Sequence, residues 1–154
     1  DPVVLPAVWT CCEGVEAVDA APAETWGGLW LFAGRDGMDV GAFLRRNGAT
    51  GLRWVVVLDR ETESLSCDDR LWIASSNCDP SRDVTIEGDI VVLDARTKAG
   101  GVNGFDRRWP NVVASSAETI ARVDARWNEY GLGGFVESPS VKYGALQKRP
   151  GAEY

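Results

Sequence analysis

The sequence predicts an α/β fold: a single layered domain with a mostly parallel sheet flanked by helices, followed by an extended C-terminal tail. Short apolar runs typical of strands alternate along the chain with segments of helical periodicity. The strongest run, LRWVVVLD at 52–59, is continuously apolar at its centre, as in a strand covered on both faces of a parallel sheet. The 154 residues, of which 45% are hydrophobic, suffice for one domain core. We expect the domain to span 1–132 and the Gly/Pro-rich, basic tail to span 133–154.

The first half of the chain provides two expected strands and the helix between them. The run GGLWLFA at 27–33 suits a buried strand. Asp39 can cap a helix over 40–47, which Asn47-Gly48 would end. The core-facing side of that helix would consist of Val40, Phe43 and Leu44. The valine-rich strand then follows.

The second half continues with a helix and one or two further strands. Ser66 is expected to cap a helix over 67–77, with Trp72 in the core. The segment 83–95 predicts either a hairpin across Glu87-Gly88 or one bent strand.

The best-defined helix begins at a capping box formed by Ser115 and Glu118 and ends at Gly131. Apolar residues follow the box at helical spacing. Those expected to face the core are Ile120, Val123, Trp127 and Tyr130.

Composition and charge exclude several classes of function. The net charge is −7, with 23 acidic and 16 basic residues, so we do not expect nucleic acid as a partner. No apolar run approaches the roughly 20 residues that span a bilayer, so we expect no membrane association. Histidine is absent, which excludes Ser-His-Asp and Cys-His centres within this chain. The four cysteines form no C-x-x-C pair, so we expect no metal site. We expect the thiols to be reduced, as in a cytoplasmic protein.

Charged residues gather after the apolar run that ends at Asp94. In parallel sheets functional groups collect at the carboxyl ends of the strands, where Asp59 is also expected. The loop after Asp94 carries Arg96 and Lys98. Either these charges face water, or the loop meets a cofactor-bearing domain or the mouth of a substrate pocket.

A second candidate segment consists of Arg107, Arg108 and Trp109. Tryptophan and arginine are enriched at binding hot spots, so this segment is a candidate contact with another chain. A tryptophan followed by proline, as in Trp109-Pro110, is also typical of a buried side chain beside a turn. Both interpretations stay open.

A series of short motifs runs in order through roughly half of the chain. Its members are Val55 through Asp59, Leu71-Trp72, Asp79-Pro80-x-Arg82-Asp83, Asp94-Ala95 with Lys98, Arg107 with Trp109-Pro110, and Val123-Asp124 with Trp127. The series resembles the C-terminal domain of the UbiD-type decarboxylases, which depend on prenylated flavin mononucleotide. Arg96 departs from the third position of the family's DAT-x-K segment.

The resemblance implies that the prenylated FMN, the metal and the acid/base residues are held by a partner chain or by upstream domains. No catalytic residue is then expected in this chain. The expected partner is a larger UbiD-like catalytic chain or the upstream domains, within a homo- or hetero-oligomer. The residues that would lie at an interface or near the cofactor are Asp94, Arg96, Lys98, Arg107, Arg108 and Trp109.

Three functions are compatible with these observations. The first is a component, either C-terminal domain or small subunit, of a UbiD-like decarboxylase or carboxylase of aromatic or α,β-unsaturated acids, supplying pocket closure and oligomer contacts. The second is a non-catalytic assembly or partner-binding module that kept the fold. The third is an unrelated α/β small-ligand binder. Because the chain begins at Asp1 rather than Met, we expect either a removed upstream part or a piece of a longer polypeptide.

Overall fold

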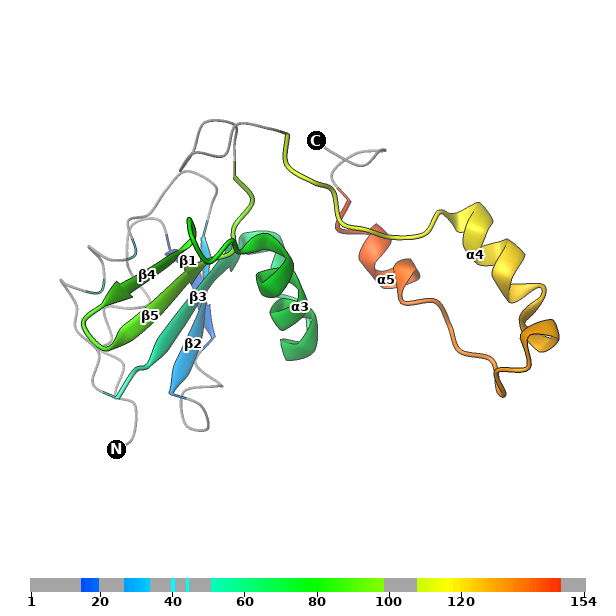
Figure 1. The fold of residues 1–154 in the computed structure, drawn as a ribbon, viewed down its shortest axis with the longest axis horizontal. Coiled ribbons are helices and arrows are strands. Elements are labelled where there is room, and N and C mark those ends of the chain that lie inside the picture. The colour runs from blue at the N-terminus through cyan, green and yellow to red at the C-terminus, as the bar shows by residue number, and fades with distance from the viewer. Residues whose placement is uncertain are drawn as a thin grey trace. The chain divides into compact units, whose positions relative to one another are not determined.

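The computed structural model describes residues 15–19, 27–33, 40, 44, 51–98 and 108–147. The chain divides into two compact units, Asp1–Asp106 and Arg107–Tyr154. The first unit contains a sheet, and the second contains short helices joined by loops (Figure 1). No helix within the described residues is long and apolar enough to cross a membrane. The boundary predicted from composition, between 132 and 133, differs from this division and stays a prediction.

The described part of the first unit contains a mixed sheet of five strands, in the order β1-β2-β3-β5-β4. The strands are β1 (Val15–Asp19), β2 (Gly28–Ala33), β3 (Trp54–Asp59), β4 (Val84–Glu87) and β5 (Ile90–Asp94). The central strands β2, β3 and β5 are parallel, whereas β1 and β4 pair antiparallel at the two edges. The α/β fold class is confirmed, with parallel pairing confined to the centre of the sheet.

The segment predicted as a hairpin or one bent strand is a hairpin. In β4 and β5, which pair antiparallel, Glu87 lies opposite Ile90. Gly88 in the turn has φ 62°, the left-handed region that glycine adopts without strain. Because β5 also pairs with β3, the strand that ends in Asp94 is an inner strand of the sheet.

The helix α3 (Cys67–Asn77) begins and ends where the sequence predicts, after the short 3-10 helix η2 (Arg60–Thr62). Ser66 is the N-cap, and its Oγ accepts a hydrogen bond from the backbone N–H of Asp69 at 3.3 Å. The buried residues of α3 share one face and are Asp69, Arg70, Ile73 and Ala74. Trp72 lies off this face and is 36% exposed, so its assignment to the core is wrong.

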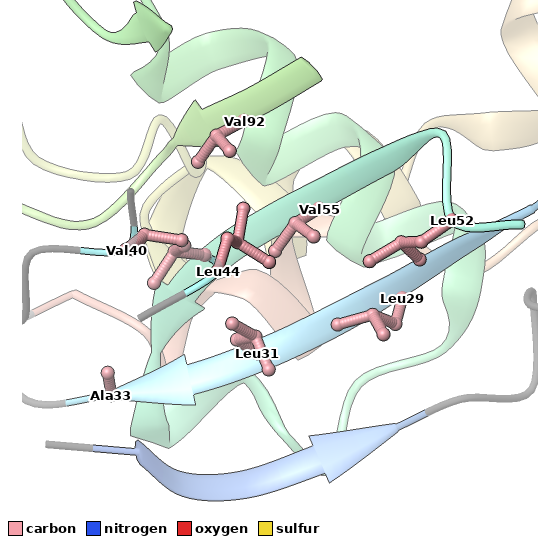
Figure 2. Packing of buried hydrophobic residues seen from close by; sticks show 9 residues of the cluster. Leu29, Leu31, Ala33, Val40, Leu44, Leu52, Val55 and Val92 are labelled. Atoms are coloured by element: carbon pink, nitrogen blue, oxygen red, sulfur yellow. The ribbon is translucent and has the colours of Figure 1, made fainter. Parts of the chain in front are cut away.

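The main apolar cluster lies on one face of the sheet (Figure 2). Alternate residues of the strands supply it, because successive side chains of a strand point to opposite faces. Val40 and Leu44, two members of the helix predicted at 40–47, are helical and buried in the cluster. The remaining members are Leu29, Leu31, Ala33, Leu52, Val55, Val57 and Val92. The other residues named for the predicted helix at 40–47 lie outside the described residues, namely Asp39, Phe43 and Asn47-Gly48.

The opposite face of the sheet carries Phe32, and α3 covers it. The guanidinium carbon of Arg70 in α3 lies 4.9 Å from the centre of the Phe32 ring. The same guanidinium donates hydrogen bonds to the Asp19 carboxylate of β1 and to the carbonyl of Glu63. One buried arginine thus links the helix, two strands and the turn before the helix.

The described part of the second unit contains α4 (Ala117–Asp124), the 3-10 helix η3 (Trp127–Tyr130) and α5 (Ser140–Gly144). The N-cap of α4 is Ser116, whose Oγ accepts a hydrogen bond from the Thr119 N–H at 3.2 Å. The predicted capping box of Ser115 and Glu118 is therefore wrong by one residue. The backbone N–H of Ser115 donates to Oγ of Ser140 at 2.9 Å, which joins the start of α4 to α5.

The apolar face predicted for this helix is present but only partly covered. No residue of α4 or η3 is buried, and Val123 is 37% exposed. Trp127 is partly exposed, so its assignment to the core is wrong. The prediction of one helix that continues to Gly131 is wrong, because α4 ends at Asp124. Gly131 instead ends the separate 3-10 helix η3, as its left-handed C-cap with φ 65°.

A buried charge cluster as candidate functional site

Asp94, Arg96 and Lys98 lie together at the carboxyl ends of β3 and β5. Because these strands are parallel, Asp59 and Asp94, their last residues, meet at the same edge of the sheet. We call the polar group at this edge the strand-end cluster. Its members are Asp59, Asp83, Asp94, Arg96, Thr97 and Lys98.

Asp94 and Arg96 form a two-pronged ion pair. Nε of Arg96 lies 2.8 Å from Oδ1 of Asp94, and Nη2 lies 2.6 Å from Oδ2. The backbone N–H of Arg96 also donates to Oδ1 at 3.2 Å. Arg96 is buried, with 6% of its surface exposed. The interpretation that this loop turns its charges to water is therefore wrong for Arg96.

Lys98 connects three segments of the first unit. Its Nζ donates hydrogen bonds to the carbonyls of Asp94 at 2.7 Å and Arg96 at 2.8 Å. It also lies 3.4 Å from the carbonyl of Asn77, the last residue of α3. The fourth contact is an ion pair with Asp83 at 3.5 Å. Only 3% of the Lys98 side chain is exposed, so this ammonium group is a buried tie between α3, the start of the hairpin and the end of β5.

Asp83 is the residue that the sequence analysis missed as a site candidate. Its carboxylate is fully buried and accepts hydrogen bonds from Nε and Nη2 of Arg82 at 2.8 and 2.7 Å. The backbone N–H of Asp79 donates to Oδ2 at 2.8 Å. The backbone of Asp83 accepts from the N–H of Asp94 at 2.9 Å. The signal available in the sequence was the D-P-x-R-D turn, which places Arg82 beside Asp83.

Asp59 forms the other side of the cluster. Its Oδ2 accepts hydrogen bonds from the backbone N–H of Thr97 at 3.0 Å and from the Thr97 hydroxyl. The hydroxyl of Thr62 donates to the carbonyl of Asp59 at 2.7 Å. Its second carboxylate oxygen, Oδ1, is buried without a hydrogen-bond partner among the described residues.

Burial and neighbouring charges set the protonation of the cluster. Burial lowers the pKa of Lys98, although the carboxylates of Asp94 and Asp83 oppose this shift. Burial would raise the pKa of Asp94, but the hydrogen bonds and charge of Arg96 outweigh it and leave this pKa lowered. The pKa of Arg96 is raised, first by its hydrogen bond to Asp94. The Asp94–Arg96 pair is therefore charged at neutral pH.

The free energy of unfolding should depend on pH because of the Asp94 carboxyl group. Because its pKa is lower in the folded chain than in the unfolded chain, its contribution is present above the unfolded pKa of about 3.9 and is lost as pH falls through the folded pKa. We expect Asp94→Asn to unfold about 1 kcal/mol more easily than the parent at pH 7. The difference should shrink at pH 3, as measured by urea unfolding at both pH values. An equal difference at both would contradict this role of Asp94.

The cluster offers little reactive chemistry of its own. Burial, followed by the charge of Asp83, raises the pKa of the neighbouring Cys78 thiol and disfavours the thiolate nucleophile. Within the described residues no group of acidic, cysteine or histidine side chains could hold a metal ion. The contacts of Lys98 with Asn77, Asp94 and Asp83 make the cluster a tie between structural elements.

The second candidate segment is only partly described. Arg107 lies outside the described residues, Arg108 is exposed, and Trp109 is buried. The burial of Trp109 agrees with the interpretation of a buried side chain beside a proline turn. A contact between this segment and another chain stays a prediction, as does any such contact of Asp94, Arg96 and Lys98.

No protein family model matches the chain. An uncharacterized protein of Aeropyrum pernix is 29% identical over 152 residues, which covers 84% of this chain and 31% of that protein. An uncharacterized protein of Archaeoglobus fulgidus is 34% identical over 92 residues, and one of Aquifex aeolicus is 32% identical over 93 residues. These matches cover 49% and 51% of this chain and 19% of each relative. The chain thus spans less than a third of the length of these relatives.

Two structures of the vanillic acid decarboxylase of Sedimentibacter hydroxybenzoicus in its open form resemble the chain weakly. One has a TM-score of 0.48 and 14% identity, and covers 79% of this chain and 30% of that chain. The other has a TM-score of 0.45 and 16% identity, and covers 76% and 28% respectively.

Proposed function

We propose that this chain is a component of a UbiD-like decarboxylase or carboxylase that acts on an aromatic or α,β-unsaturated carboxylic acid. It is either the C-terminal domain or a small subunit, and it supplies pocket closure and oligomer contacts. One observation carries the proposal: two motifs of the resemblance, at 79–83 and 94–98, close into one buried network. The link between them is the ion pair of Lys98 and Asp83 at 3.5 Å.

The network supports this proposal because it gives the motif residues a common physical purpose. Lys98 and Asp83 are both buried and each contacts the backbone of other segments. Such a network specifies how the start of β4 meets the ends of α3 and β5, since partial loss leaves a buried charge with weaker compensation. In this proposal, the motif residues hold the domain in the shape that contacts its partner.

The strand-end cluster does not fit the phosphate of the flavin. A flavin mononucleotide needs cationic side chains or free backbone N–H groups for its phosphate. The basic side chains of the cluster and its flank are already bound, Arg82 to Asp83, Arg96 to Asp94, and Lys98 to Asp83 and carbonyl groups. We therefore place the prenylated FMN, in this proposal, on the partner chain or on upstream domains, together with the catalytic acid and base.

The self-contained cluster also favours the alternative of a non-catalytic assembly or partner-binding module. In that case the fold is kept and the chain supports an assembly that has no decarboxylation chemistry. The domain contacts its partner in the same way in both functions. The two functions differ only in whether the assembled complex catalyses decarboxylation.

The test is native mass spectrometry of the complex purified through an affinity tag on this protein in the cells that produce it. The expected result is a complex with flavin absorption, in which this sequence is joined to a catalytic chain or forms part of a longer one, and which releases CO₂ from an aromatic or α,β-unsaturated acid. A colourless assembly without turnover would contradict the decarboxylase proposal and support the assembly module. The mass of the polypeptide that carries this sequence separates domain from subunit.

A further inference from the structure

The second unit contains an apolar groove that the strand-end cluster and its proposed role do not involve. Its volume is about 250 Å³, and it lies between α4 with η3 and the segment 136–139. The apolar lining consists of Ile120, Val123, Trp127, Val136 and Pro139.

The two walls of the groove are held in place by contacts within the second unit. The indole N–H of Trp127 donates to the carbonyls of Gly133 and Gly134, at 3.2 and 3.1 Å. The Trp127 ring also meets the Phe135 ring edge-on, with centres 5.6 Å apart. At the other end, the hydrogen bond from Ser115 to Ser140 joins the start of α4 to α5. The groove is therefore a formed feature of the unit.

The charges of the groove are all of one sign. Two carboxylates, Asp124 and Glu137, line it together with the apolar residues, and no lysine or arginine of the described chain does. Neither carboxylate has an ion pair within the described residues, whereas the nearby Arg126 is bound to Glu129 at 2.8 Å. The groove is thus complementary to a positive charge carried on an apolar stem.

The size and surroundings of the groove favour a side chain of another polypeptide over a free small molecule. Its volume of about 250 Å³ is below the roughly 300–1,000 Å³ of ordinary small-molecule sites. Several large apolar side chains of the same unit are exposed, and where such side chains are contiguous they mark protein contacts. They are Tyr130, Leu132, Phe135, Val136 and Val141.

We propose that this groove binds an arginine side chain that is presented by an apolar segment of another polypeptide chain. Arginine fits better than lysine, because its planar guanidinium stacks on an indole and pairs with carboxylates at the same time. Trp127 offers the indole, and Asp124 and Glu137 offer the carboxylates. The inference depends on the groove alone and holds whether or not the assembly is a decarboxylase.

The test uses the full chain labelled with ¹⁵N and an acetylated, amidated Leu-Arg-Leu peptide as the probe. The matched control peptide carries citrulline, which keeps the shape of arginine and lacks its charge. Binding is followed by the NMR shift of the Trp127 indole N–H, assigned with Trp127→Phe, up to about 10 mM peptide. The double variant Asp124→Asn with Glu137→Gln removes both charges of the groove. The double variant Asp68→Asn with Asp89→Asn makes the same charge change at exposed sites of the first unit.

We expect saturable binding of the arginine peptide, at least about 10-fold weaker binding of the citrulline peptide, and loss of that difference only in the groove variant. Equal binding of the two peptides would overturn the inference in favour of a purely apolar contact. No saturable shift would overturn it as well. The spectrum of each variant also reports whether its fold is intact, so a folding defect is not mistaken for lost binding.

Discussion

Replacing Lys98 by methionine is expected to destabilise the protein by about 3 kcal/mol. The change keeps the apolar stem but leaves the buried Asp83 carboxylate and the carbonyls of Asp94 and Arg96 without their ammonium donor. Urea unfolding followed by tryptophan fluorescence measures the loss. Arg60→Met is the control, because Arg60 pairs with Glu63 at the surface and an exposed pair contributes about 1 kcal/mol or less.

Equal losses in the two variants would show that the strand-end cluster does not stabilise the fold as its burial implies. The proposed function adds a second expectation for the isolated complex. Lys98→Met should lower turnover only as far as it lowers the amount of folded chain. A variant that assembles fully but turns over slowly would instead indicate that Lys98 acts on the substrate or cofactor side.

Leu31→Ala is expected to cost about 3 kcal/mol, because the side chain is fully buried in the centre of the apolar cluster and its removal leaves a cavity. The matched control is Ile86→Ala on the edge strand β4, where the side chain is 72% exposed. This control should change the free energy of unfolding by about 0.5 kcal/mol or less. Urea midpoints of both variants against the parent provide the measurement.

A small loss for Leu31→Ala would place the core elsewhere than on this face of the sheet. A large loss for Ile86→Ala would show that the exposed side of β4 is covered in the folded protein. Either result would change the interpretation of the first unit.

Elements with strong local signals were predicted well from the sequence. The valine-rich strand and α3 could be predicted because a continuous apolar run and a serine cap each determine the structure of the few residues around them. The start of α4 was misplaced by one residue, since Ser115 and Ser116 are equally good caps in isolation. In the folded chain Ser116 is the cap, and the backbone of Ser115 contacts Ser140, which is distant in sequence.

The position of the candidate site in the sequence was predicted, but the burial of its charged side chains was not. Asp94, Arg96 and Lys98 were identified from their place after a strand and from the family resemblance. Their burial was not predictable, because it depends on the end of α3 and on Asp83 before the hairpin. Asp83 was missed because its contacts with Lys98 and Asp94 join residues that are distant in the sequence.

The tryptophans show a further limit of periodicity. Helical spacing identifies the apolar side of a helix, but it does not say whether another element covers that side. Trp72 lies in α3 and Trp127 in the 3-10 helix η3, and both are partly exposed in the folded chain. What covers an amphipathic face is a property of the assembly rather than of the local sequence.

The place of β5 in the sheet has a consequence for the order of folding. The β4–β5 hairpin closes over a two-residue turn and needs only local contacts, whereas the pairing of β5 with β3 joins segments far apart in the chain. The contacts of Lys98 with Asp83, Asp94 and Arg96 lie within the hairpin and its flank, whereas its contact with the Asn77 carbonyl needs α3 in place. The hydrogen bond from Thr97 to Asp59 likewise needs β3 in place. We expect these two long-range contacts to form late, to influence the rate of folding little and to slow the opening of the native state, so that they act as a kinetic latch.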